Sequence, residues 1–105
     1  MKGAFYPEYV KRLTGTHVKS AASKAEMVEQ LRADIVRFRA EKGLSRVVAV
    51  WCGSTETFIT PGPVHQTIDA FEEGLRKSDP SISNAQLYAW ACLREGVPFA
   101  NGAPN

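Results

Sequence analysis

The chain has 105 residues, of which 44% are hydrophobic and 23% charged, and its formal net charge is +2. This composition is typical of one globular domain and excludes disordered, collagen-like and disulfide-rich chains. No apolar run approaches the roughly 20 residues that a membrane helix needs. The first residues also lack the apolar core of a secretory signal. We therefore expect a cytoplasmic protein without a membrane segment.

Basic residues are concentrated in the first part of the chain. Up to Arg46 there are ten basic residues against five acidic ones. A nucleic-acid surface would interleave such bases with aromatic side chains for base stacking. Here the bases instead alternate with acids along a helical pattern, which favours a solvated helix face. We expect no nucleic-acid partner.

Residues 1–22 show no clear period and are interpreted as an irregular lead-in, with a short helix after Pro7 as an alternative. From Ser23 the pattern is clear. Ser23 and Glu26 have the spacing of a capping box, so we expect a helix to begin there. Gly43 supplies a left-handed residue that ends it. The buried stripe of this helix recurs at steps of three and four residues, namely Met27, Val28, Leu31, Ile35 and Phe38.

The segment 46–51 consists of Arg46 followed by five apolar residues, with no alternation of polar and apolar positions. Such a run predicts a strand covered on both faces, as in a parallel sheet. Small polar residues follow at positions 52–57. At the carboxyl end of a parallel strand, small residues let the backbone approach a ligand. The sequence therefore predicts a ligand-binding turn after this strand.

Two further helices are expected in the second half of the chain. The first is predicted from Val64 to about Lys77, and Asp79 and Pro80 stop it. The second begins after Ser83, which with Gln86 forms another capping box.

Two apolar residues flank that second capping box. Ile82 and Leu87 occupy its staple positions, and Gly96 ends the helix. Residues 97–100 are then predicted to be a short extended piece, and residues 101–105 a turn.

The expected order for residues 23–105 is helix, strand, helix, helix, short strand. This is an α/β fold with about three helices around one or two parallel strands. A strand buried on both faces needs neighbours on both edges, and the sequence offers none that is convincing. We therefore expect residues 1–105 to be a partial α/β domain, cut from a larger one.

The residues with reactive side chains form no clear constellation. Cys52 and Cys92 are too few for a disulfide framework or a zinc site and are interpreted as buried thiols. His17 and His65 are interpreted as surface or loop residues, because neither has a second histidine at ligand spacing. Cys52 with His65 as nucleophile and base is an alternative, although nothing in the sequence orients the imidazole. Glu56 is interpreted as a solvated carboxylate, with an acid–base role as the alternative. No metal site is expected.

Three segments together resemble a known family. They are residues 47–56 (VVAVWCGSTE), 83–91 (SNAQLYAWA) and 95–105 (EGVPFANGAPN). In order and spacing they are similar to myo-inositol-1-phosphate synthase, also called inositol-3-phosphate synthase. The resemblance implies a fragment of a Rossmann-like NAD-binding domain. It also implies a homotetrameric, NAD-dependent enzyme that converts D-glucose 6-phosphate to 1D-myo-inositol 3-phosphate, by sugar oxidation, aldol ring closure and re-reduction.

The resemblance also implies cofactor contacts. The family turn Thr-Ala-Asn-Thr-Glu, which contacts NAD, aligns with Cys52, Gly53, Ser54, Thr55 and the glutamate after them. A second family turn near NAD, Asn-Gly-Ser-Pro, aligns with Asn101, Gly102, Ala103 and the following proline. The two turns differ at Ala103, where the family has serine.

Two departures weaken side-chain contacts but leave backbone N–H groups in place. Ser54 is shorter than asparagine, and Ala103 lacks a hydroxyl. The family's glycine loop and catalytic lysines belong to other segments, so no catalytic residue is assigned here.

The resemblance favours an inactive piece of the synthase, and two other interpretations remain open. The first is a free-standing small binding module that uses its exposed strand edges. The second is an unrelated α/β protein, because short motifs can mislead.

Overall fold

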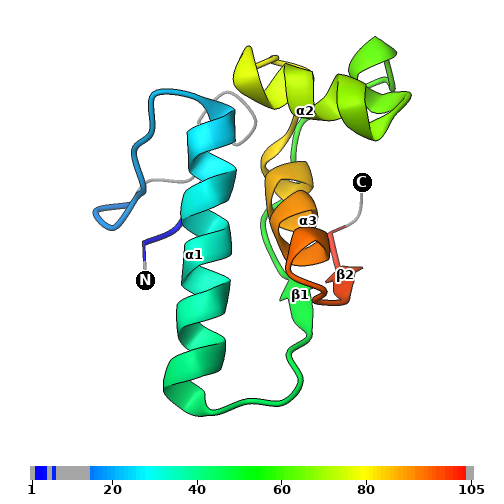
Figure 1. Ribbon diagram of the computed structural model, residues 1–105. Helices are drawn as coiled ribbons and strands as arrows, with labels where there is room; N and C mark the ends of the chain where they lie inside the picture. The colour runs from blue at the N-terminus through cyan, green and yellow to red at the C-terminus, as the bar shows by residue number, and fades with distance from the viewer. Residues whose placement is uncertain (1, 5, 7–14, 104–105) are drawn as a thin grey trace.

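A computed structural model describes residues 2–4, 6 and 15–103 (Figure 1). Its elements, in chain order, are α1 (Lys24–Lys42), β1 (Ala49–Trp51), the 3-10 turn η2 (Pro63–His65), α2 (Ile68–Arg76), α3 (Asn84–Arg94) and β2 (Phe99–Asn101). The predicted α/β fold class, with three helices and two parallel strands, is confirmed in this part of the chain. The alternative helix after Pro7 lies outside the described residues.

α1 begins and ends where the sequence indicates. The Ser23 hydroxyl accepts a hydrogen bond from the Glu26 N–H at 3.1 Å. The Glu26 carboxylate, however, accepts from the Ala22 N–H at 2.9 Å, one residue before the N-cap. Gly43 ends the helix with φ of 60°, a conformation that glycine adopts without a Cβ penalty.

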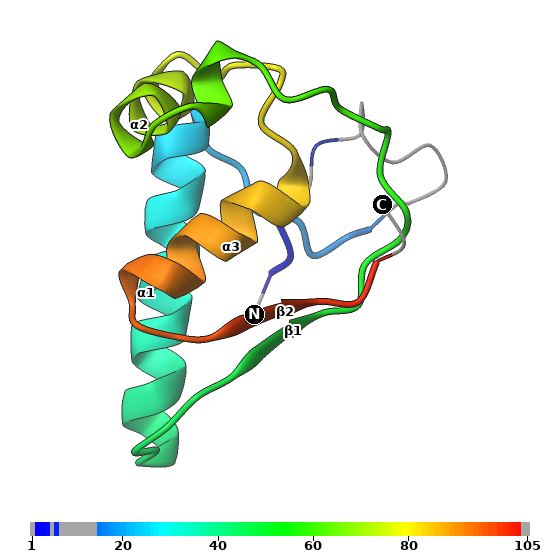
Figure 2. The same cartoon turned by 90° about the vertical axis from the view of Figure 1, so that its right-hand side faces the viewer.

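The two strands pair in parallel, with Ala49 opposite Phe99 and Trp51 opposite Asn101. Figure 2 shows them running side by side. The expectation that the long strand lacks any neighbour is therefore wrong on one edge, because residues 99–101 supply one.

The expected strand over 46–51 is also too long, since only residues 49–51 pair. It is not covered on both faces, because residues Val48 and Val50 are 66% and 63% exposed. An apolar run indicates that a strand can be covered on both faces, but it does not show which elements cover it. Within the described residues, no layer covers these two valines.

The second predicted helix starts later than expected. Val64 lies in the separate turn η2, and α2 begins after Thr67, whose hydroxyl accepts from the Ala70 N–H at 3.0 Å. A threonine that caps a new helix interrupts the apolar spacing, which had suggested one continuous helix. The helix ends at Arg76, and Ser78 then takes a left-handed φ of 54°.

The predicted capping box of α3 is confirmed. The Ser83 hydroxyl accepts from the Gln86 N–H at 3.4 Å, and the Gln86 side-chain oxygen accepts from the Ser83 N–H at 3.0 Å. The staple residues Ile82 and Leu87 are completely buried. They join the core that α1, α2 and α3 form between them, of which the buried members are Ala4, Met27, Val28, Leu31, Val64, Leu75, Ile82, Leu87 and Ala91.

Not all charges of α1 lie on a solvated face. Lys24 is only 2% exposed, and its ammonium donates to the carbonyls of Asp79 and Ile82, each at 2.7 Å. Asp34 is also buried and pairs with Lys19 at 2.6 Å. The expectation of a solvated basic face is therefore wrong at Lys24, where the charge satisfies carbonyls of the loop before α3.

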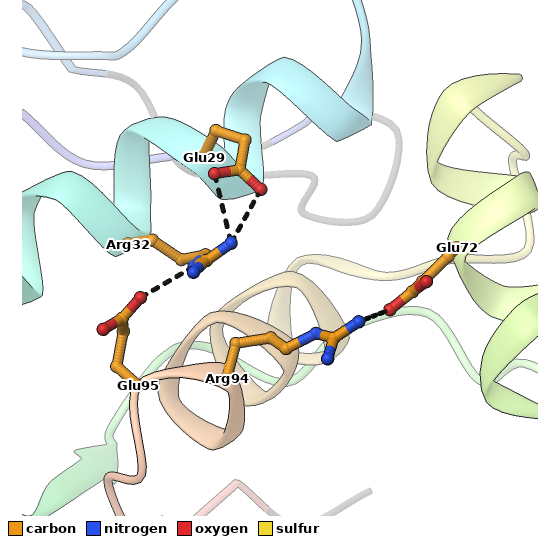
Figure 3. Close-up of polar contacts among 5 residues, drawn as sticks. All are labelled: Glu29, Arg32, Glu72, Arg94 and Glu95. Atoms are coloured by element: carbon orange, nitrogen blue, oxygen red, sulfur yellow. Dashed lines mark hydrogen bonds and ion pairs between the residues drawn. The ribbon is translucent and has the colours of Figure 1, made fainter.

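Ion pairs connect the three helices (Figure 3). Arg32 of α1 donates from Nε to Glu95 at the end of α3 at 2.7 Å, and this bond raises the pKa of Arg32. Arg94 of α3 pairs with Glu72 of α2. The guanidinium carbons of Arg32 and Arg94 lie 5.8 and 5.3 Å from the centre of the Trp90 ring, within cation–π range.

None of the helices in the described part of the chain is long and apolar enough to cross a membrane.

Candidate cofactor-binding edge

The two predicted ligand turns meet at one edge of the sheet. Because β1 and β2 are parallel and Trp51 pairs with Asn101, residues 52–55 and residues 101–103 lie at the same carboxyl end of the sheet. The Gly102 N–H donates to the Trp51 carbonyl at 2.9 Å and continues the ladder. The structure therefore brings together all seven residues that the resemblance singles out. In open α/β sheets, this is the edge at which ligands bind.

Most of these residues are open to solvent. Cys52, Ser54, Thr55, Asn101 and Gly102 are exposed; Gly53 and Ala103 are half-buried. The interpretation of both cysteines as buried thiols is therefore wrong for Cys52. Cys52 is the first residue of the turn after β1 and does not belong to the core. Cys92, inside α3, is buried as expected, and burial raises the pKa of its thiol.

The turns differ in the backbone donors that they offer. Within the described residues, the N–H groups of Gly53, Ser54 and Thr55 donate no hydrogen bond to another protein group. In contrast, the Gly102 N–H is used by Trp51, and the Ala103 N–H donates to the Asn101 side-chain oxygen at 2.9 Å. The backbone donors that a ligand can use thus lie after β1.

Aromatic rings support the first turn from behind. A Cβ added to Gly53 would lie 2.4 Å from the Trp51 ring, so glycine allows the indole to fold against the turn. The same indole packs on Tyr88 of α3, with ring centres 4.9 Å apart. The Tyr88 hydroxyl accepts from the Ala4 N–H at 2.8 Å, and burial raises its pKa. The turn therefore rests on α3 through two rings.

Glu56 does not lie in solvent as expected. It is only 7% exposed, and both carboxylate oxygens lie 3.3 Å from the Ala85 nitrogen in the first turn of α3. The free N–H groups and the dipole at a helix N-terminus favour a carboxylate there. The contact joins positions 29 residues apart, and no local sequence pattern signals it.

The histidines have structural contacts. His65 accepts at Nδ1 from the Gly62 N–H at 3.0 Å, so Nε2 carries the proton and donates to the Ser81 carbonyl at 3.1 Å. Neither bond involves Cys52, and the considered nucleophile–base pair is not formed. His17 is exposed and bonds only to the neighbouring Thr16 hydroxyl. The described residues hold no cluster of three metal-ligating side chains.

A small hollow of about 180 Å³ lies beside this edge. Asn101 lines one part of it, and the others are residues 56–59 and the start of α3, including Ser83, Ala85 and Gln86. The edge is thus continuous with a concave surface that is partly polar.

A parallel strand pair with small-residue turns at its carboxyl edge is typical of α/β domains that bind ligands at that edge. Comparison with known proteins specifies it further. A family model described as myo-inositol-1-phosphate synthase, which represents an NAD-binding domain, matches residues 1–105. The chain belongs to the myo-inositol-1-phosphate synthase family.

Relatives from distant organisms agree. The chain is 43% identical over 106 residues to inositol-3-phosphate synthase 1 of Bacteroides thetaiotaomicron, covering all of this chain and 25% of that protein. It is 33% identical over 109 residues to inositol-3-phosphate synthase 1 of Oryza sativa subsp. japonica, covering all of this chain and 21% of that one. The chain thus spans about a quarter or less of these relatives.

A solved structure shares the fold. The crystal structure of inositol-3-phosphate synthase from Caenorhabditis elegans superposes with a TM-score of 0.91 at 27% identity, over 99% of this chain and 21% of that one. The interpretation as an unrelated α/β protein is therefore wrong.

NAD is the cofactor of this domain family, and the edge fits it. The unpaired donors of residues 53–55 can bind the oxygens of a dinucleotide, and no large side chain stands among them. The donor set at 102–103 fits less well, because protein acceptors already use both N–H groups.

Proposed function

We propose that this chain is the part of an NAD-dependent inositol-3-phosphate synthase that holds one side of the cofactor. The whole enzyme would convert D-glucose 6-phosphate to 1D-myo-inositol 3-phosphate, in inositol and phospholipid biosynthesis. The observation that carries the proposal is the juxtaposition of turns 52–55 and 101–103 at one sheet edge, in a chain that belongs to this family.

The proposed contacts come from both turns. After β1, the N–H groups of Gly53, Ser54 and Thr55, with the Ser54 and Thr55 hydroxyls, would bind NAD, and Cys52 would contact it at the start of the turn. At the end of β2, Asn101 would contribute its side-chain amide. Gly102 and Ala103 would let NAD approach the backbone closely, because their side chains are small. They would donate no hydrogen bond to it, because protein acceptors already use their N–H groups.

NAD when bound supplies a hydride acceptor and donor for the sugar. The described residues contribute binding and orientation, and we assign no proton transfer to them. The groups that act on the substrate would come from the remaining three quarters of the enzyme. The 105-residue chain alone is therefore expected to be inactive. By family resemblance, we further propose a homotetramer in the cytoplasm.

A segment exchange tests the proposal. The matching segment of the Bacteroides thetaiotaomicron enzyme, which is 43% identical, is replaced by this chain. The chimera is assayed for conversion of glucose 6-phosphate to inositol phosphate with added NAD. We expect product, and we expect little from a Ser54→Pro chimera, which loses one free N–H group. A chimera that folds and assembles like its parent but binds no NAD would contradict the proposal and favour the free-standing module.

A further inference from the structure

Glu56 lies directly after the turn that we assign to NAD, yet it points away from solvent. Its carboxylate, 7% exposed as a residue, accepts the Ala85 N–H with both oxygens at 3.3 Å. Ala85 is the second residue of α3, and the Ser83 hydroxyl accepts the next N–H, that of Gln86. The two side chains therefore share the free N–H groups at this helix end.

This arrangement has a consequence for ligand binding. A helix N-terminus is often where a phosphate binds. Here a carboxylate of the chain itself already occupies that place, and a phosphate beside it would be repelled. The N-terminus of α3 is thus not the phosphate site of this edge. Its bond to Glu56 is an attachment between α3 and the turn.

A second attachment lies at the other end of the same turn. Trp51, which precedes residue 52, packs its ring against Tyr88 of α3 at 4.9 Å. Ala85 and Tyr88 are three residues apart, so they lie on one face of the helix. The four residues 52–55 are therefore held between two contacts to one rigid element, one polar and one aromatic. Such support preorganises a loop for binding.

We propose that Glu56 is a positioning residue, which fixes turn 52–55 on α3 so that its unpaired N–H groups face NAD. It does so without touching the cofactor. This inference rests on the proposed function, because it takes NAD as the ligand of the turn. It goes further by assigning a role to a residue outside the two cofactor turns.

The test uses the chimera described above, in four versions: unchanged, Glu56→Gln, Glu56→Ala and Glu72→Ala. Glu72 is the matched control. It lies on α2, pairs with Arg94 of α3 and touches neither turn. We expect Glu56→Ala to weaken NAD binding by at least about tenfold. Glu56→Gln keeps an acceptor oxygen and is expected to recover part of that loss. Glu72→Ala is expected to bind NAD as the unchanged chimera does.

Hydrogen exchange separates positioning from a general loss of structure. In Glu56→Ala, amides of residues 52–55 should exchange faster in the absence of NAD, while those in the middle of α3 keep their protection. Unchanged exchange at 52–55, or unchanged NAD affinity in Glu56→Ala, would overturn the proposal. A starting chimera that binds no NAD would contradict the proposed function instead, and the exchange measurement would still decide whether Glu56 holds the turn.

Discussion

Replacing Lys24 by methionine tests how the loop before α3 is held. The ammonium of Lys24 donates to two carbonyls, those of Asp79 and Ile82, at 2.7 Å each. Its nitrogen also lies 5.2 Å from the centre of the Tyr6 ring. Methionine keeps the apolar stem but cannot donate, so both carbonyls lose this donor. Bonds from a charged donor contribute about 1.5–3 kcal/mol each, and removing the buried charge recovers part of their sum.

We therefore expect Lys24→Met to lower the free energy of unfolding by about 3 kcal/mol. For a domain near 100 residues this corresponds to a fall in Tm of roughly 12–24 °C. Urea denaturation of the purified chain, followed by circular dichroism, measures the change. The matched control is Lys42→Met, an exposed lysine in the last turn of the same helix, for which the helix dipole predicts a loss below about 1 kcal/mol. Equal midpoints for the two variants would show that the Lys24 ammonium does not hold the loop before α3.

Three further outcomes are expected. Ser83→Ala should lower the free energy of unfolding by about 1 kcal/mol in urea denaturation, because α3 loses its N-cap, and an unchanged midpoint would contradict the capping assignment. Iodoacetamide at pH 8 should modify the exposed Cys52 well before the buried Cys92, as followed by mass spectrometry. The modification rate of Cys92 should keep rising at higher pH, because burial raises the pKa of that thiol. Equal rates for the two cysteines would contradict the difference in burial. A double-mutant cycle of Arg94→Met and Glu72→Gln should give a coupling of at most about 1 kcal/mol that weakens with salt, since the two side chains are 49% and 23% exposed; a larger coupling insensitive to salt would be inconsistent with a surface pair.

Local signals in the sequence predicted much of the fold. The capping serines Ser23 and Ser83 and the glycines Gly43 and Gly96 marked helix ends correctly, because capping depends on a few neighbouring residues. The apolar spacing from Val64 hides the cap at Thr67 and predicts one helix where the structure has the turn η2 and the helix α2.

Contacts between distant positions could not be predicted in the same way. The pairing of β1 with β2 joins positions 50 residues apart, so the sequence predicts a short extended piece at residues 97–100 but does not show that it pairs with β1. The burial of Lys24 and of Glu56 arises from loop carbonyls and a helix end that only the folded chain brings near. For the candidate site, the resemblance supplied the residues, whereas the structure distinguished the free N–H groups after β1 from the engaged ones after β2.

A crystal structure of the chimera with NAD would show directly whether this edge holds the cofactor. We expect the dinucleotide to lie along the edge formed by the ends of β1 and β2, with N–H groups of Gly53, Ser54 or Thr55 at about 2.7–3.2 Å from its oxygens. NAD bound elsewhere, with both turns open to solvent, would contradict it.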